Sequence, residues 1–311
     1  MKSDRDMSEL KDNPIISIVL PVFNGEKYLP EAIESVLNQS FAGWELIIID
    51  DCSTDKTPEI IRTYTDKDTR IVSFRNSTNS KLPASLNNGF EHARGKYYTW
   101  TSDDNRFKEN ALEQLKQCLD TNPSIDFVYS DYERIGETGE SLNEVSFPGP
   151  EKLPIQNTVG ACFLYRRELA QCVGKYDENL YLIEDYDYWL RCLLNGKLRH
   201  LPLVLYEYRV HGNSLTNKRK REITVKQSEL RGKYYHQLYN KVVGTKEMAA
   251  YLYTSRKLKV QEAPSLSRAL ISCPGFFPYL LKRTFIWPIK GMVRKVIETI
   301  FPGFRNRKVK Y

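Results

Sequence analysis

"ELIIIDDCSTDKTPEII" (residues 45–61) decides the fold, because it joins a strand signal directly to a helix signal. Its apolar run has no polar alternation, which is typical of a parallel strand covered on both faces. The helix that follows has Thr57 as a candidate N-cap, Pro58 at the first helical position and Glu59 in the first turn. The segment therefore predicts one strand–helix unit of an α/β sheet.

The same alternation extends through the first 130 residues. Strands are expected at 15–23, 45–50, 70–74, 96–100 and 126–130, with helices near 29–39, 58–65, 82–94 and 107–120 between them. After Asp131 we expect a polar connection, then strands at 160–167 and 201–210 and a helix at about 184–195. This order is typical of a doubly wound α/β domain with a mostly parallel sheet.

Four parts of the chain are distinguished on this basis. They are a leader (1–14), the α/β domain (15–216, with halves 15–131 and 132–216), a helical extension (217–262) and a basic amphipathic tail (263–311). The formal net charge is +7, but the tail alone holds ten basic residues and one acidic residue. The rest of the chain is therefore slightly acidic.

The tail predicts contact with an anionic membrane surface. It places apolar residues at helical spacing on one side and basic residues on another, which is typical of an interfacial helix. The alternative is a helix packed on the domain with a solvated basic face. Nucleic-acid binding is not expected, because the basic charge is confined to one end of the chain.

The charged N-terminus, the lack of long apolar runs and the cysteine pattern predict the cellular compartment. The start, "MKSDRDMSELKDNP", is charged, and no apolar run reaches the roughly 18 to 20 residues that cross a bilayer. We therefore expect a cytoplasmic protein, peripherally associated with the cytoplasmic face of the membrane. The six cysteines have no metal-ligand spacing and are expected to be buried, reduced thiols rather than zinc ligands or disulfides; they are Cys52, Cys118, Cys162, Cys172, Cys192 and Cys273.

Three acidic pairs follow strands or open a helix: Asp50–Asp51, Asp103–Asp104 and Glu184–Asp185. Ligands of open parallel sheets bind beyond the carboxyl ends of the strands. The chain has neither G-x-G-x-x-G after the first strand nor G-x-x-x-x-G-K-[ST]. A nucleotide would therefore be bound through carboxylates and Mg²⁺ or Mn²⁺, whose preferred ligands are oxygens.

Each pair also has a purely structural interpretation. Asp104 or Asn105 could cap the helix near 107–120, and Asp50–Asp51 could form a polar turn. Glu184 and Asp185 could cap the helix that they open. His211, in "YRVHGNS", could be a turn residue rather than a ligand.

Several motifs in a fixed order favour the functional interpretation of these acidic pairs over the structural one. Residues 16–61, "ISIVLPVFNGEKYLPEAIESVLNQSFAGWELIIIDDCSTDKTPEII", and 95–105, "GKYYTWTSDDN", strongly resemble the family 2 glycosyltransferases of the GT-A fold. The resemblance is close over 15–131 and weaker to about 216. It implies an inverting enzyme that moves a sugar from a nucleotide diphosphate sugar to a hydroxyl of a glycan or lipid-linked saccharide, in cell-surface polysaccharide biosynthesis.

The resemblance also implies roles for single residues. Asp51 would accept a hydrogen bond from the base, Asp103 would contact the ribose, and Asp104 would ligate Mn²⁺ or Mg²⁺. Asp185 matches the general-base position and Glu184 precedes it, while His211 would approach the metal or the diphosphate. The base and ribose pocket would be lined by Pro21, Val22, Phe23 and Asn24, with Glu26 nearby.

One departure from the family pattern concerns the diphosphate. Many relatives have an Arg-Asn pair in the helix before the metal strand, whereas this chain has Leu86 before Asn87. The diphosphate would then contact Lys81, Arg94 or the metal alone. Two other functions are alternatives: a sugar nucleotidyltransferase, whose Gly-rich basic loop is absent from "PVFNGEKYL", and a catalytically inactive glycan- or lipid-binding scaffold.

Overall fold

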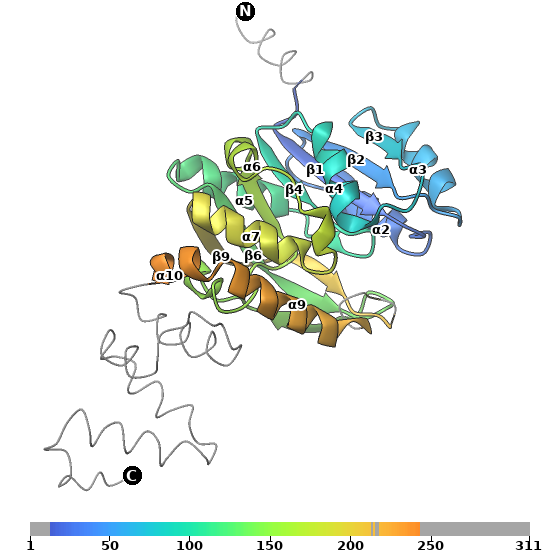
Figure 1. The fold of residues 1–311 in the computed structure, drawn as a ribbon. Coiled ribbons are helices and arrows are strands. Elements are labelled where there is room, and N and C mark those ends of the chain that lie inside the picture. Colours follow the sequence, from blue (N-terminus) through green and yellow to red (C-terminus); the bar gives the residue numbers. More distant parts are fainter. Residues whose placement is uncertain (1–12, 213, 215–217, 243–311) are drawn as a thin grey trace, which may run out of the picture. The chain divides into compact units, whose positions relative to one another are not determined.

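The computed structural model describes residues 13–212, 214 and 218–242 (Figure 1). The chain divides into two compact units, 1–227 and 228–311, and the α/β domain belongs to the first. Residues 1–12, most of the expected leader, lie outside the described residues, as do residues 243–311 with the whole basic tail. Among the described helices, none is both long and apolar enough to cross a membrane.

The core of the first unit is one mixed sheet with strand order β3-β2-β1-β4-β8-β6-β9-β5, and β7 pairs with β6. The strands are β1 (Ile16–Val22), β2 (Trp44–Asp50), β3 (Ile71–Arg75), β4 (Tyr97–Trp100), β5 (Arg106–Phe107), β6 (Phe127–Ile135), β7 (Ser141–Val145), β8 (Phe163–Arg166) and β9 (Leu198–Arg209). The helices are α2 (Leu29–Leu37), α3 (Thr57–Thr65), α4 (Lys81–Glu91), α5 (Ala111–Thr121), α6 (Arg167–Val173), α7 (Glu184–Asn195), α9 (Lys220–Lys233) and α10 (Tyr235–Val242), with short 3₁₀ turns at Pro150–Lys152 and Glu178–Leu180.

The carboxyl ends of most strands lie at one edge of the sheet. β1 is parallel to β2 and β4, and β2 is parallel to β3. β8 is antiparallel to both β4 and β6, so β6 runs in the same direction as β4, and β9 is parallel to β6. The carboxyl ends of all these strands except β8 therefore point to the same edge. The predicted fold class, a mostly parallel α/β sheet, is confirmed.

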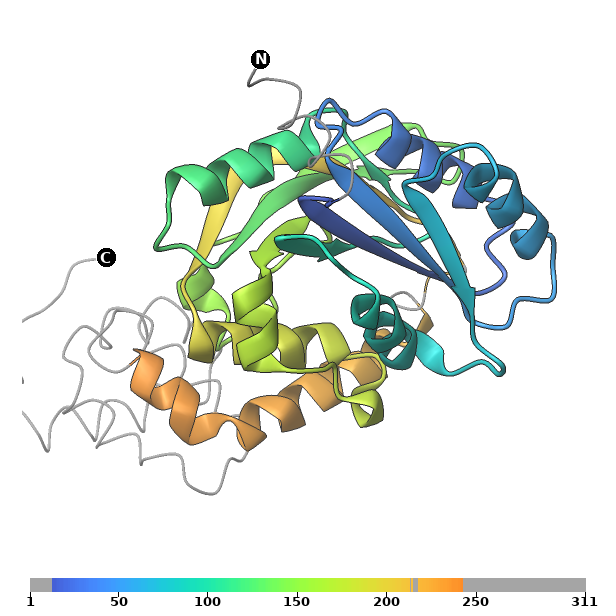
Figure 2. The same cartoon turned by 90° about the horizontal axis from the view of Figure 1, so that it is seen from above.

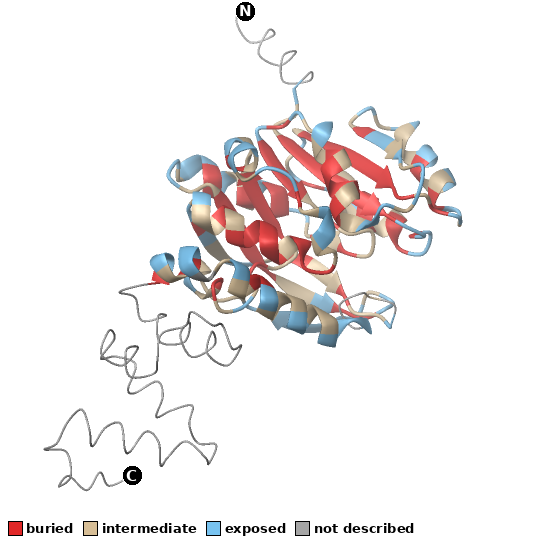
Figure 3. Ribbon diagram, in the orientation of Figure 1, coloured by how far each residue is buried: buried red, intermediate tan, exposed pale blue. Residues whose placement is uncertain are grey.

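Apolar side chains on the two faces of β1 and β2 explain the uninterrupted apolar runs. One face, with Ile18 and Leu20, belongs to a core shared with α2, α3 and α5. On the other face, α4 approaches so closely that a Cβ on Gly89 would lie 2.3 Å from the Val19 side chain. Helices therefore cover both faces of the sheet (Figure 2), and the central strands β1 and β2 are buried along their whole length (Figure 3).

Three local expectations were wrong. The connection expected after Asp131 is a hairpin of β6 and β7. The helix expected from 107 begins at Ala111, because Arg106 and Phe107 form β5 against β9. Thr57 is not the N-cap of α3; its N–H donates to Asp55 Oδ1 at 3.0 Å.

The cysteines also depart in part from expectation. Cys118, Cys162 and Cys192 are buried, whereas Cys52 is half-buried and Cys172 is exposed. Cys273 lies outside the described residues. Burial raises the pKa of the Cys162 thiol to about 12, so this thiol stays protonated and packs as a small apolar side chain.

Candidate functional site

The loop between β4 and β5 carries Asp103 and Asp104. It does not cap a helix, because the residue before α5 is Asn110 and neither Asp104 nor Asn105 contacts that helix terminus. Instead, Asn105 Oδ1 accepts a hydrogen bond from the backbone N–H of Arg209 at 2.8 Å. The capping alternative for Asp104 and Asn105 is therefore wrong, and the loop is fastened to the end of β9.

Asp104 and His211 come from distant parts of the chain and meet at this edge. His211 Nε2 lies 2.9 Å from Asp104 Oδ2. His211 follows the carboxyl end of β9, and its ring also lies near Tyr28, with 5.4 Å between ring centroids. The structure thus places together the two residues that the sequence suggested as metal ligands.

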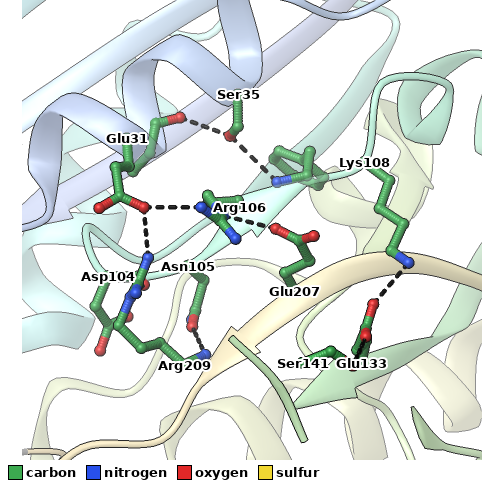
Figure 4. Close-up of polar contacts among 12 residues, drawn as sticks. Glu31, Ser35, Asp104, Asn105, Arg106, Lys108, Glu133, Ser141, Glu207 and Arg209 are labelled. Carbon is green, nitrogen blue, oxygen red and sulfur yellow. Dashed lines mark hydrogen bonds and ion pairs between the residues drawn. The ribbon is translucent and has the colours of Figure 1, made fainter. Parts of the chain in front are cut away.

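A fully buried arginine, Arg209, holds this arrangement (Figure 4). Its guanidinium donates to the backbone carbonyl of Asp104 at 2.9 Å, to the carbonyls of Gly136 and Glu137 at 3.3 and 3.0 Å, and to Glu31 Oε2 at 2.7 Å. Sequence reasoning missed Arg209. Its only signal was a basic residue at the carboxyl end of a predicted strand.

A second arginine extends the cluster to α2 and β9. Arg106 pairs with Glu31 Oε2 at 2.9 Å and with Glu207 Oε2 at 2.6 Å (Figure 4). The loop that carries Asp104 is thereby tied on one side by Arg209 and on the other by Arg106. Two strand ends and one helix fix its position.

Asp103 lies in a crowded place next to Asp104. Burial, the charge of Asp104 and the charge of Asp55 raise the pKa of Asp103 to about 8. A Cβ on Gly25 would lie 2.3 Å from Asp103 Oδ2, so the backbone at position 25 needs glycine for this close approach. The chain after β1 and the loop after β4 are therefore in direct contact.

The residues expected to line the base and ribose pocket interlock with the loop after β2. Asn24 has a left-handed backbone, with φ of 54°, and its Oδ1 accepts from the Thr54 N–H at 2.8 Å. Glu26 Oε2 accepts from the Lys56 N–H at 3.0 Å. Pro21 and Val22 are buried within β1, whereas Phe23 is 47% exposed and offers an open ring face at this edge.

Asp51 organises the segment before α4. Its Oδ1 accepts from Asn76 Nδ2 at 2.8 Å and from the Ser80 N–H at 2.7 Å, and its Oδ2 accepts from the Lys81 N–H at 2.9 Å. The neighbouring Asp50 pairs with Arg75. The two carboxylates therefore differ: Asp50 is neutralised by an arginine, whereas Asp51 holds backbone and amide donors of residues 76–81.

Only one of the two basic candidates for the diphosphate lies at this edge. Arg94 pairs with Glu45 at 2.8 Å, at the amino end of β2, which is the opposite edge of the sheet. Lys81 begins α4 beside Asp51, and its side chain is exposed. Arg94 is therefore excluded as a diphosphate contact.

Asn87 serves a structural role. Its amide donates to the carbonyl of Tyr176 at 3.0 Å and accepts from the Tyr176 N–H at 2.8 Å. It thus anchors the turn that leads to α7.

Glu184 and Asp185 are the first two residues of α7, and Ile183, not either acid, is its N-cap. Neither acid is therefore the N-cap residue, although Asp185 satisfies one N–H of the first turn. Asp185 Oδ1 accepts from the Tyr186 N–H at 2.7 Å, and Asp185 Oδ2 accepts from Asn157 Nδ2 at 3.1 Å. Burial raises the pKa of Asp185, and burial together with the charge of Asp185 raises the pKa of Glu184 to about 8. Such values are typical of a proton-transfer site.

Asp104 and His211 supply two possible ligands for a divalent cation, so a bound substrate or water would have to supply the others. Within the described ranges there is no group of three or more His, Cys, Asp or Glu side chains that could hold a metal ion. Mg²⁺ and Mn²⁺ commonly bind through one or two protein groups plus substrate phosphates. A carboxylate and an imidazole at one position fit this pattern for Mn²⁺ or Mg²⁺.

The comparisons with known proteins agree with the geometry. A family model described as glycosyl transferase family 2 matches residues 17–174. An uncharacterized glycosyltransferase of Rickettsia typhi is 32% identical over 216 residues, which cover 66% of this chain and 67% of the relative. The putative teichuronic acid biosynthesis glycosyltransferase TuaG of Bacillus subtilis is 30% identical over 209 residues, which cover 66% of this chain and 82% of the relative.

Two solved structures have a similar fold. S. aureus TarS, in complex with UDP-GlcNAc, has a TM-score of 0.57 at 18% identity, covering 94% of this chain and 93% of the other. The mannosyltransferase PcManGT from Pyrobaculum calidifontis, in complex with GDP-Man and Mn²⁺, has a TM-score of 0.59 at 13% identity, covering 94% and 88%. At such identities the similarity shows the fold alone.

Proposed function

Because the chain belongs to glycosyl transferase family 2 and is a glycosyltransferase, we propose that it moves a sugar from a nucleotide diphosphate sugar to a hydroxyl of a glycan or lipid-linked saccharide. The observation that carries this proposal is the meeting of Asp104 and His211 at the carboxyl edge of the sheet, 2.9 Å apart. The relation to TuaG supports a role in cell-surface polysaccharide biosynthesis.

The donor is bound along the ends of β1, β2 and β4. Phe23 offers a ring face for the base, Asp51 accepts a hydrogen bond from it, and Asp103 contacts the ribose. Lys81, exposed beside Asp51, is the better placed of the two basic candidates for the diphosphate. The nucleotide complexes of TarS and PcManGT support a nucleotide sugar as the donor class.

Asp104 and His211 are the residues that would hold the divalent cation, with the donor phosphates supplying further oxygen ligands. When bound, this cation stabilises the negative charge that develops on the leaving diphosphate. The Mn²⁺ in the PcManGT complex supports this choice. Arg209 keeps Asp104 in place through the backbone carbonyl, so that its carboxylate stays directed toward His211.

Asp185 is the general base. It accepts the proton of the acceptor hydroxyl while that oxygen forms a bond to the anomeric carbon. The bond from the anomeric carbon to the diphosphate oxygen breaks, and its electron pair leaves with the diphosphate. One such displacement inverts the anomeric centre. The bonds from Tyr186 and Asn157 favour the ionised form of Asp185 that this role needs.

A screen of UDP-, GDP- and dTDP-sugars with Mn²⁺ or Mg²⁺, read by thermal stabilisation and by slow donor hydrolysis, tests the function. The Asp185→Asn protein should keep metal-dependent nucleotide binding and lose about 10²- to 10⁴-fold in transfer rate. If none of these donors stabilises or is consumed by the wild-type protein, the proposed donor class is wrong.

Membrane association through residues 263–311 rests on sequence alone. We propose that this tail binds anionic lipid. Sedimentation of the full chain with vesicles of phosphatidylglycerol and phosphatidylcholine, compared with phosphatidylcholine alone, tests it. Equal sedimentation with both vesicle types would contradict an electrostatic contribution.

A further inference from the structure

The segment that precedes β8 is held against the start of α7. Tyr186 Oη donates to the carbonyl of Leu153 at 2.8 Å, and Asn157 Nδ2 donates to Asp185 Oδ2 at 3.1 Å. Thr158 and Val159, which follow, are buried. The chain around Asn157 is therefore fixed next to the proposed general base.

The orientation of the Asn157 amide follows from chemistry. A carboxylate only accepts hydrogen bonds, so the amide must present its NH₂ group to Asp185 and its carbonyl oxygen away from it. That oxygen, Asn157 Oδ1, is buried, and no donor within the described residues reaches it. Buried amide oxygens in native proteins nearly always have a partner.

A ligand is the natural source of the missing donor. The oxygen and the NH₂ group belong to one planar amide, so a group that donates to Oδ1 is separated from the Asp185 carboxylate by only the width of that amide. Asp185 is itself half-buried rather than fully enclosed. The neighbouring Glu184 Oε2 is a second buried oxygen without a donor in the described part of the chain.

We propose that Asn157 is a positioning residue for Asp185 and an acceptor-binding residue: its NH₂ group orients the base, and its Oδ1 accepts a hydrogen bond from a second hydroxyl of the acceptor, adjacent to the reacting one. The inference rests on the proposed function. It narrows the acceptor class, because a sugar or polyol with neighbouring hydroxyls satisfies both groups. An isolated alcohol leaves Asn157 Oδ1 unpaired.

The test pairs a protein change with a substrate change. The probes are methyl glucoside, galactoside, mannoside and N-acetylglucosaminide, and for the best of these its monodeoxy analogues. The wild-type protein should lose about five- to tenfold in kcat/KM when the hydroxyl next to the reacting one is removed, which is typical of one neutral hydrogen bond. We call the kcat/KM for the full sugar divided by the kcat/KM for its deoxy analogue the deoxy ratio. In the Asn157→Ala protein the deoxy ratio should fall close to one, because the partner of that hydroxyl is gone.

A second readout tests the positioning role without an acceptor sugar. In the Asn157→Asp protein a donor to Asp185 is lost and a like charge is added, while Glu184, the other acid beside Asp185, is unchanged. Both effects raise the pKa of Asp185. The acidic limb of the pH–rate profile for donor hydrolysis should therefore move up by about one pH unit or more.

Controls separate this inference from the proposed function. Gln156, an exposed amide one residue earlier, gives the matched control Gln156→Ala, which should behave as wild type. Metal-dependent stabilisation by the nucleoside diphosphate that binds the wild-type protein should be the same in all three variants. An unchanged deoxy ratio in Asn157→Ala, with donor binding intact, overturns the acceptor contact, and an unchanged pH limb in Asn157→Asp overturns the positioning role. Failure of donor binding in the wild-type protein would instead overturn the proposed function.

Discussion

Replacing Arg209 by methionine should destabilise the domain and loosen the loop of Asp104. Methionine fills similar space but offers no donors. The carbonyl of Gly136 loses its Arg209 donor but keeps the N–H of Gly139 at 3.1 Å, so this loss costs about 0.5–1.5 kcal/mol. The carbonyls of Asp104 and Glu137 are less buried and each lose a bond of about 0.5–1.5 kcal/mol.

Glu31 adds little to this sum, because its side chain is 43% exposed and keeps its ion pair with Arg106. The total is about 3 kcal/mol, which for a domain of this size lowers Tm by about 6 to 12 °C. Because Arg209 also supports Asp104, the Mn²⁺ concentration that half-saturates nucleotide binding should rise.

Thermal unfolding, followed by circular dichroism with and without Mn²⁺ and the nucleoside diphosphate, measures both effects. Arg62→Met is the matched control, since the Arg62 side chain is 83% exposed and its change should shift Tm by less than about 2 °C. If Arg209→Met unfolds within about 2 °C of wild type and keeps its Mn²⁺ dependence, the cluster does not hold the loop.

The other predictions concern three further positions. Asp104→Asn should raise the Mn²⁺ concentration needed for nucleotide-induced stabilisation by at least about tenfold; an unchanged Mn²⁺ titration would remove Asp104 from the metal site. The Glu184 pKa of about 8 lies above its ordinary 4.5, so the folded protein binds the extra proton and loses stability as pH rises from about 4.5 to 8. Glu184→Gln should therefore gain Tm relative to wild type as pH rises across that window, and parallel Tm profiles would contradict the raised pKa. Gly25→Ala places a Cβ 2.3 Å from Asp103 Oδ2 and should cost about 1–3 kcal/mol and weaken nucleotide affinity; calorimetric titration checks this, with Gly232→Ala, which meets no atom within 4 Å, as the control.

The parallel strands could be predicted because strands buried on both faces consist mainly of apolar residues. Every residue of β1 and β2 is buried, so both strands appear as continuous apolar runs. β7 could not be found in this way, since its residues are almost all exposed and carry no apolar pattern. β5 is only two residues long and depends on pairing with β9, about a hundred positions later.

The sequence predicted the acidic residues of the candidate site but not Arg209 or Asn157. Acids at the ends of parallel strands could be placed at one edge from the order of strands and helices alone. The same order could have excluded Arg94, because the helix of a βαβ unit runs back to the amino edge before the next strand begins. Arg209 and Asn157 could not be found, since Arg209 mostly binds backbone carbonyls and the Asn157 oxygen has no partner within the described chain.

The connection from β7 to β8 has a consequence for how this protein could diversify. Residues 146–162 form no strand or long helix; the exposed positions of such a connection tolerate substitution better than the elements that it joins, whereas Leu153, Thr158 and Val159 are buried. Only Asn157 ties this connection to the Asp185 carboxylate by a side-chain hydrogen bond that the structure describes. An evolving lineage could therefore exchange the exposed positions of the connection, and with them the sugar that receives the transferred group, while the donor-binding edge of the sheet stays unaltered.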